Sequence, residues 1–326
     1  TSADATINSL TVGKGANSVA GNTVLGESAL DASVSGGNNT AIGSAALTAN
    51  TSGANNTAVG SSSLDVNTTG ASNTGVGRSS LGGNTTGDQN TALGHGSLLS
   101  NTTADKNTAV GYLALNLNTT AGQNTAVGAL ALEINTTGQD NTAVGMDCMR
   151  LNTTGSQNVA VGQNSLEANT TASNNTAIGY EALKVNTTGT RNAALGSFSL
   201  DANTTGGNNV ALGSHTLTNA TTASNNTAVG DGAMAANTTG TKNTAVGASC
   251  LDANTTGDHN TAVGIDALGA NTTGASNVAM GDRALKANTT NSNNVAIGYR
   301  SLTSQTVADQ NTAVGADSMY TNTTGE

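Results

Sequence analysis

A 17-residue unit is repeated eighteen times in this chain of 326 residues, with no insertion or deletion between copies. Each copy begins with Asn-Thr-Ala-Val-Gly or a close variant, and its glycine recurs every 17 residues from Gly26 to Gly315. A fixed short period is typical of a solenoid, in which each unit forms one coil that stacks on its neighbours. We therefore expect one elongated solenoid over residues 22–326, with an incomplete last repeat, after an irregular lead-in over residues 1–21. Coil positions are numbered 1 to 17 from the Asn of this motif.

The composition limits both the core and the range of functions. Aromatic residues make up 2% of the chain and charged residues 9%, proline is absent, and there are 42 glycines. Such a chain can fill only a thin core with small and medium side chains. The formal net charge is -10 and basic residues do not cluster, which argues against nucleic-acid binding. No apolar run is long enough to cross a membrane, so we expect no direct membrane insertion.

The apolar pattern within one coil predicts β-structure. Thr-Ala-Val alternates with period two, and position 4 is apolar in every coil, so positions 2 and 4 are expected to face inward. Leu or Met at position 9 predicts a second short strand that faces the same interior. The predicted fold is an all-β parallel β-solenoid (β-roll) with about 18 coils and two short strands per coil. The predicted core residues include Val59, Leu64, Val110, Leu115 and Val144.

Invariant asparagines and glycines predict ladders and corners. Identical residues stack on themselves when residue i lies above residue i+17, and Asn amides can then hydrogen-bond from coil to coil. The expected Asn ladder includes Asn22, Asn39, Asn56, Asn73, Asn90, Asn107, Asn124 and Asn141. Glycine favours corners that need a positive φ or a close backbone approach. The expected corner glycines include Gly26, Gly43, Gly60, Gly77, Gly94 and Gly111.

The small residues at position 3 predict an assembly surface. Position 3 is Ala in sixteen coils, and the alternation that turns position 4 inward turns position 3 outward. A flat strip of small side chains is typical of a surface that packs against another chain. In the alternative interpretation, this Ala packs under a neighbouring turn of its own coil. The candidate interchain strip includes Ala58, Ala92, Ala109, Ala126 and Ala143.

No motif in the sequence indicates catalysis or a cofactor. His95, His215 and His259 occupy different positions in distant coils, so they do not predict a metal site. Nucleophile elbows, phosphate-binding loops and calcium-binding repeats are all absent. We expect no enzymatic activity and no bound metal or cofactor. Tyr112, Tyr180 and Tyr299 share position 6 and are weak candidates for surface ligand contacts, because ordinary surface variation explains them better.

The repeats resemble a known class of fibrous proteins. Val-Ala-Val-Gly, Thr-Ala-Ile-Gly and Asn-Val-Ala-Ile-Gly, each followed four residues on by Leu, resemble the head repeats of trimeric autotransporter adhesins. The 17-residue form is also similar to repeats in tail-fibre-like proteins of phages and bacteria, which often end in an endosialidase-type chaperone domain. The lead-in from Leu10 to Val19 is similar to the segment that precedes such repeats. The resemblance implies a left-handed β-roll that packs as a homotrimer, although the coil is longer than the usual adhesin-head coil.

These observations predict a structural or adhesive fibre segment. The shaft or head of a trimer on a cell or virion surface would project outward and attach to a host-surface glycan or protein receptor. One alternative is an ice-binding solenoid that uses the Thr and Asn ladders of Asn-Thr-Thr at positions 12 to 14. This alternative requires the Thr ladders to lie flat and exposed. Another is an extracellular filament subunit in which coil stacking continues from chain to chain.

Overall fold

The computed structural model describes residues 4–32 and 34–321. Residues 1–3 of the expected lead-in and residues 322–326 of the incomplete last repeat therefore lie outside the described residues. The chain divides into two compact units, residues 1–158 and 159–326. The first unit contains β1 (Ala5–Ile7), β2 (Leu10–Gly13), the short 3-10 turn η1 (Ala16–Ser18), β3 (Thr23–Gly26), β4 (Thr40–Ile42), β5 (Thr57–Val59), β6 (Thr74–Val76), β7 (Thr91–Leu93), β8 (Thr108–Val110), β9 (Thr125–Val127) and β10 (Thr142–Val144). The second unit contains β11 (Val159–Val161), β12 (Thr176–Ile178), β13 (Ala193–Leu195), β14 (Val210–Leu212), β15 (Thr227–Val229), β16 (Thr244–Val246), β17 (Thr261–Val263), β18 (Val278–Met280), β19 (Val295–Ile297) and β20 (Thr312–Val314).

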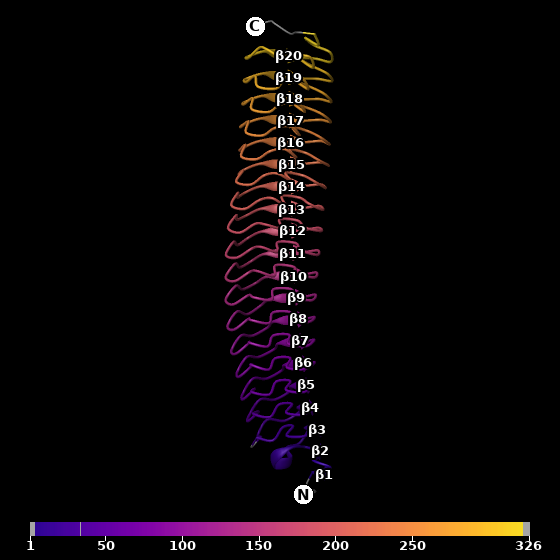
Figure 1. Ribbon diagram of the computed structural model, residues 1–326, viewed down its shortest axis with the longest axis vertical. Coiled ribbons are helices and arrows are strands. Elements are labelled where there is room, and N and C mark those ends of the chain that lie inside the picture. Colours follow the sequence, from indigo (N-terminus) through magenta and orange to yellow (C-terminus); the bar gives the residue numbers. More distant parts are fainter. Residues whose placement is uncertain (1–3, 33, 322–326) are drawn as a thin grey trace. The chain divides into compact units, whose positions relative to one another are not determined.

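From β3 to β10, and again from β11 to β20, neighbouring strands pair in parallel with a shift of one repeat. Thr40 pairs with Thr57 and Ile42 with Val59, and every later pair within each unit keeps this 17-residue register. Figure 1 shows the strands of each unit at the same place in successive coils. The prediction of an all-β parallel β-solenoid with 17-residue coils is confirmed.

The lead-in forms part of the sheet. Strands β1 and β2 form an antiparallel hairpin, and β2 pairs antiparallel with β3, so that Val12 lies opposite Leu25. The Asp4 carboxylate accepts hydrogen bonds from the backbone N–H groups of Lys14, at 2.8 Å, and Gly15, at 2.6 Å. The first coil's strand edge is therefore paired rather than open, an arrangement that blunts edge-to-edge pairing with another sheet.

The facing of the strand is the reverse of the prediction. The position-3 residues of the candidate interchain strip are fully buried inside their own chain, at 0% exposure: Ala58, Ala92, Ala109, Ala126 and Ala143. Val59, Val110 and Val144, predicted as core, are only half-buried, and Leu93 at the same position is 48% exposed. Positions 2 and 4 do share one face, as period two requires, but it is the outer face. The Ala strip is therefore not an interchain surface, and the alternative interpretation that Ala packs within its own coil agrees with this burial.

The second predicted strand is also wrong. Positions 6 to 11 form consecutive turns instead of a strand, and Leu64 and Leu115 at position 9 adopt positive φ values of 52° and 51°. Both leucines are nevertheless fully buried. Left-handed residues alternate with right-handed ones here, which curls the chain tightly enough to point Leu into a narrow interior. Backbone bonds still run from coil to coil, for example from the Leu64 N–H to the Ser80 carbonyl at 3.0 Å.

The position-5 glycines are needed for two reasons. Gly43, Gly60, Gly77, Gly94 and Gly111 have φ values from 130° to 140°, a region that side chains disfavour. The coils also approach closely there, because a Cβ added to Gly60 would lie 2.5 Å from the carbonyl oxygen of Gly77. Gly26 lies in β3 without a positive φ, but a Cβ there would collide with the Gly43 carbonyl.

We predict that Gly60→Ala lowers the free energy of unfolding by about 2–3 kcal/mol, since it combines a disfavoured φ with a backbone clash. Urea melts followed by far-ultraviolet circular dichroism measure this loss. The control is Ser61→Ala at the next, exposed position, where Ala129 and Ala248 occur naturally in other coils. Equal stability of the two variants would contradict the close-approach argument.

Candidate functional site

The interior of each coil holds a network of side-chain amides. The Asn56 Oδ1 accepts the backbone N–H of Asn73 at 2.9 Å, and its Nδ2 crosses the coil to donate to the Gly70 carbonyl at 2.9 Å. The same carbonyl accepts a second bond from Nδ2 of Asn67, at 2.9 Å, and this Nδ2 also donates to Oδ1 of Asn50 at 2.9 Å. Both Asn columns therefore converge on the position-15 carbonyl and tie each coil to its neighbours.

All eight predicted ladder residues lie in this network. Asn22 is 5% exposed and the other seven are fully buried: Asn39, Asn56, Asn73, Asn90, Asn107, Asn124 and Asn141. Their Oδ1 atoms accept from the backbone of the following Asn, so this column links side chain to main chain, whereas the position-12 column links side chain to side chain. These amides are engaged in holding the coil, which leaves them no role in binding a ligand.

The threonines at position 13 do not form a flat exposed array. Thr68 and Thr85 lie in bends and are half-buried, and the Thr68 hydroxyl donates to the Thr85 carbonyl at 3.0 Å. The Asn before each of them, such as Asn67, is fully buried. The Asn-Thr-Thr segment therefore curls around a corner, with the position-13 hydroxyl bonded and the position-14 threonines, such as Thr69, exposed. This bend does not fit the flat face that the ice-binding alternative requires.

The outer face of the sheet carries the exposed apolar surface. Position 4 is Val, Ile, Leu or Met in every coil, position 2 is Thr, Val or Ala, and neither position is ever charged. Leu195 is 43% exposed, Leu212 41% and Met280 43%. β-branched and apolar side chains pack well on a pleated surface, and they give each unit an exposed, uncharged strip along its strands.

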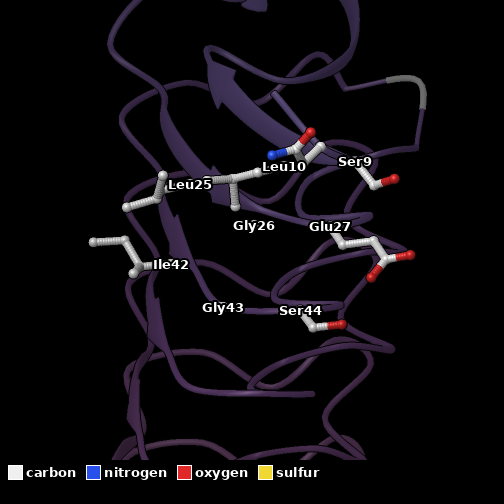
Figure 2. A pocket seen from close by; sticks show the side chains of 9 residues that line it. Ser9, Leu10, Leu25, Gly26, Glu27, Ile42, Gly43 and Ser44 are labelled. Carbon is white, nitrogen blue, oxygen red and sulfur yellow. The ribbon is translucent and has the colours of Figure 1, made fainter. Parts of the chain in front are cut away.

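At the first coils, this face borders a cavity of about 380 Å³. It is lined by Leu10, Leu25 and Ile42 with the polar residues Ser9, Glu27 and Ser44 among the others. Figure 2 shows Leu25 and Ile42 pointing the same way from adjacent coils, with Glu27 and Ser44 on the other side of the glycine column. The cavity thus marks the boundary between the apolar outer face and the polar turns.

Aromatic rings meet on the turns at positions 6 and 7. In the second unit, the Tyr180 and Phe198 rings lie 5.3 Å apart edge to face, and the Phe198 and His215 rings stack at 5.1 Å. In the first unit, His95 stacks on Tyr112 at 5.6 Å. Near β20, the Arg300 guanidinium lies 5.5 Å from the ring centroid of Tyr299 and 5.1 Å from that of Tyr320.

Each of the three candidate tyrosines therefore has a ring, imidazole or guanidinium neighbour. The sequence reasoning treated the histidines as isolated and missed Phe198 and His215 as partners of Tyr180. Writing the repeats in register would have placed these three in consecutive coils at adjacent positions. Beside them, the Lys184 ammonium lies 2.9 Å from the Glu181 carboxylate, and this hydrogen bond lowers the Glu181 pKa.

The cysteines are buried, and the potential metal ligands of the described residues do not cluster. Cys148 and Cys250 are buried small residues, and burial raises the pKa of each thiol to about 12, so the nucleophilic thiolate is suppressed at neutral pH. Within residues 4–32 and 34–321, no three His, Cys, Asp or Glu side chains gather closely enough to hold a metal ion. The same described part has no helix with the length and apolar character needed to cross a membrane.

No protein-family model matches the chain, and no curated protein matches it by sequence. The solenoid and its surfaces are therefore the basis for any functional proposal.

The column of Asn residues at position 12 is interrupted by an alanine, and replacing this alanine with Asn should stabilise the chain. Ala220 occupies this position, and Oδ1 of Asn203 in the preceding coil is buried without a hydrogen-bond partner. In intact parts of the column, this atom accepts from the next Asn, as Asn186 Oδ1 does from Asn203 at 2.7 Å. We predict that Ala220→Asn raises the free energy of unfolding by about 1–3 kcal/mol, measured by urea melts. The Asn101 Nδ2 donates to the Ala104 carbonyl at 3.1 Å, so Asn at position 12 is compatible with Ala at position 15. Ala223 is the position-15 residue of the coil that contains Ala220. A loss of stability would contradict the ladder as the source of coil cohesion.

Replacing Asp201, at position 10, should raise the stability of the chain by an amount that depends on pH. Its Oδ1 is buried without a partner, and burial raises its carboxyl pKa above 3.8. A raised folded-state pKa means that Asp201 favours the fold below its unfolded pKa and loses this contribution as pH rises through the folded pKa. At this position, Asn116 donates instead to the Gly96 carbonyl at 2.9 Å. Asp201→Asn should therefore stabilise the chain by about 1 kcal/mol at pH 7, and by less at pH 3.

Thermal melts of both proteins at the two pH values measure this difference. The control is Asp88→Asn, because the Asp88 carboxylate already accepts the Ala71 N–H at 2.6 Å and has no unmet partner. A gain for Asp201→Asn that is equal at pH 3 and pH 7 would rule out the buried charge as its cause.

Proposed function

We propose that this chain is a shaft or head segment of an extracellular fibre, and that copies of the chain associate side by side through the outer face of the sheet. The observation that supports association is the uncharged column of Thr and apolar side chains at positions 2 and 4. The resemblance to adhesin-head and tail-fibre repeats supports a trimer on a cell or virion surface. Attachment to a host-surface glycan or protein belongs to the same proposal.

The size of this face favours a partner. A three-residue strand at ~3.3 Å per residue and a coil spacing of ~4.8 Å give about 50 Å² of face per coil. The eight parallel strands β3 to β10 therefore present about 400 Å², which is in the range where exposed apolar patches mark contact sites. The second unit adds a similar face on ten strands.

The periodicity favours a second copy as this partner. A surface that repeats once per 17-residue coil is matched along its length by a surface of the same period, and another copy carries one. The absence of charge from positions 2 and 4 removes like-charge repulsion between identical faces. The proposed association surface is therefore the opposite face of the same strands, in place of the predicted Ala strip.

Two alternatives have less support. The Thr residues of the Asn-Thr-Thr segment lie in bends, and those at position 13 are already bonded, so they are a poor match to a flat ice-binding array. In an end-to-end filament, a further coil would pair in parallel with β3, but antiparallel β2 already occupies this edge.

The test is the solution mass of the chain and of a variant with a charged outer face. We predict that the wild type has a mass near three times 31.6 kDa by light scattering, and that Val127→Lys with Val144→Lys shifts it toward 31.6 kDa. Both valines are half-buried, so lysine can reach water without disturbing the interior. The matched control places the same two charges on exposed corners of the same coils, at Thr137→Lys and Thr154→Lys. A monomeric wild type, or a Val127 and Val144 variant that keeps its mass, would overturn the proposed interface.

A further inference from the structure

The aromatic stack of the second unit ends at a coil whose position-7 residue is glycine and has no side chain. This coil level, at Gly232, is called the Gly232 rung. Phe198, His215 and Gly232 occupy position 7 in three consecutive coils, and the Phe198 and His215 rings stack at 5.1 Å. A Cβ added to Gly232 would have only the Ser249 Oγ within 4 Å outside its own chain neighbours, at 4.0 Å. Gly96, at the same position in the first unit, is different because a Cβ there would lie 2.7 Å from Cδ2 of Leu113. The space over Gly232 is therefore open.

The space at the Gly232 rung is wide enough along the coil axis for one flat ring. Gly232 separates His215 from Ser249 by two coil spacings, or ~9.6 Å at ~4.8 Å each. A ring placed between them needs about 3.5–4.0 Å of van der Waals distance on each side. One ring fits on the His215 side of the gap, where it would continue the existing stack.

The rim of this gap is polar and acidic. Asp231 precedes Gly232 and is exposed, and the Ser214 hydroxyl lies 2.9 Å from Nδ1 of His215. Position-10 side chains reach back to the position-7 carbonyl 20 residues earlier, as Thr218 does to Phe198 at 3.1 Å. Asp252 occupies position 10 in the coil of Ser249, but its carboxylate cannot donate to the Gly232 carbonyl, and its Oδ1 lies toward Gly269 in the following coil. The gap thus combines one aromatic wall with carboxylate and hydroxyl groups.

The aromatic wall and the polar groups around the Gly232 rung favour an uncharged sugar ring as the ligand. An aromatic face has negative potential at its centre and attracts the positive C–H face of a sugar ring, whereas carboxylates accept bonds from sugar hydroxyls. Nucleotides and acidic sugars are disfavoured, because Asp231 repels anions and the chain has a net charge of -10. An apolar side chain of a partner would leave the polar rim unused.

We propose that the Gly232 rung, between His215 and Ser249, is a binding slot for one uncharged pyranose ring of a glycan. This inference deepens the attachment role proposed above and rests on it. Single-site binding is weak, and copies of the chain within one fibre would multiply it through multivalency.

The experiment is saturation-transfer NMR on the full chain with methyl β-D-galactopyranoside, a neutral sugar with a C–H face. At about 10 mM sugar, above the millimolar Kd of weak binding, the ring protons should receive saturation from the wild-type protein. Gly232→Leu should abolish this signal by filling the slot. Leu113 and Leu130 occupy the same position with φ values of 52° and 60°, so the backbone accepts Leu there. His215→Ser should weaken binding about three- to tenfold, the effect of losing one stacked ring.

The matched control is Ser79→Leu, at the same coil position with φ 54° in the first unit, which should leave the signal unchanged. Equal signals from the wild type, Gly232→Leu and His215→Ser would overturn the slot. No transfer from the wild type, or transfer only to methyl N-acetyl-α-neuraminide as an acidic probe, would also overturn it.

Light scattering on the same samples separates this inference from the proposed association. The slot lies on the turns, away from positions 2 and 4, so the Val127→Lys and Val144→Lys variant should keep the sugar signal. A monomeric chain that passes the sugar test supports the slot and counts against association. A chain that associates but gives no sugar signal counts against the slot alone.

Discussion

The convergence of two Asn amides on one carbonyl in each coil is the interaction on which the rest of this structure depends. Asn56 and Asn67 both donate to the Gly70 carbonyl, and each is tied to the next coil through its own oxygen or nitrogen. A thin interior cannot gain much from apolar burial, so a large share of its cohesion has to come from satisfied hydrogen bonds in a dry environment. The coils also approach closely at position 15, where a Cβ on Gly70 would lie 2.5 Å from the Gly87 carbonyl, and this position holds Gly or Ala in all but one coil.

The inward Asn also decides what the outer face becomes. Once position 1 points inward to make its hydrogen bonds, period two turns position 3 inward and positions 2 and 4 outward. Ala58 then fits between the amides of its coil, and Val59 is left on the surface. The apolar residues that look like a core in the sequence therefore form a face that another molecule can cover. The interior is specialised for stacking, and the exterior carries the uncharged face on which the proposed association rests.

Position-specific features are confined to the turns. Positions 6, 7 and 10 tolerate charged, aromatic and small side chains because their backbone is held by bonds from coil to coil, such as Ser62 to Ser44 at 2.9 Å. Neighbouring coils can thus bring together residues 17 or 20 apart in sequence, as in the stack of Tyr180, Phe198 and His215. A chemically distinct site in such a protein arises from consecutive exceptions in one column, and the Gly232 rung beside His215 is such an exception.

The repeat by itself determined the solenoid, the parallel 17-residue register, the corner glycines and the shared face of positions 2 and 4, because all of these follow from periodicity and backbone geometry. The tertiary structure decided which face points inward. Burial of Asn56 is favourable only when its partners at Gly70 and Asn73 are in place, and a rule that puts apolar residues inside cannot weigh this. The turns at Leu64 were also unpredictable, because a Leu with φ 52° is stable only where the surrounding coils hold it. The meeting of Phe198 with His215 was visible only once the coil register placed their rings in contact, 17 residues apart in sequence and 5.1 Å apart in space.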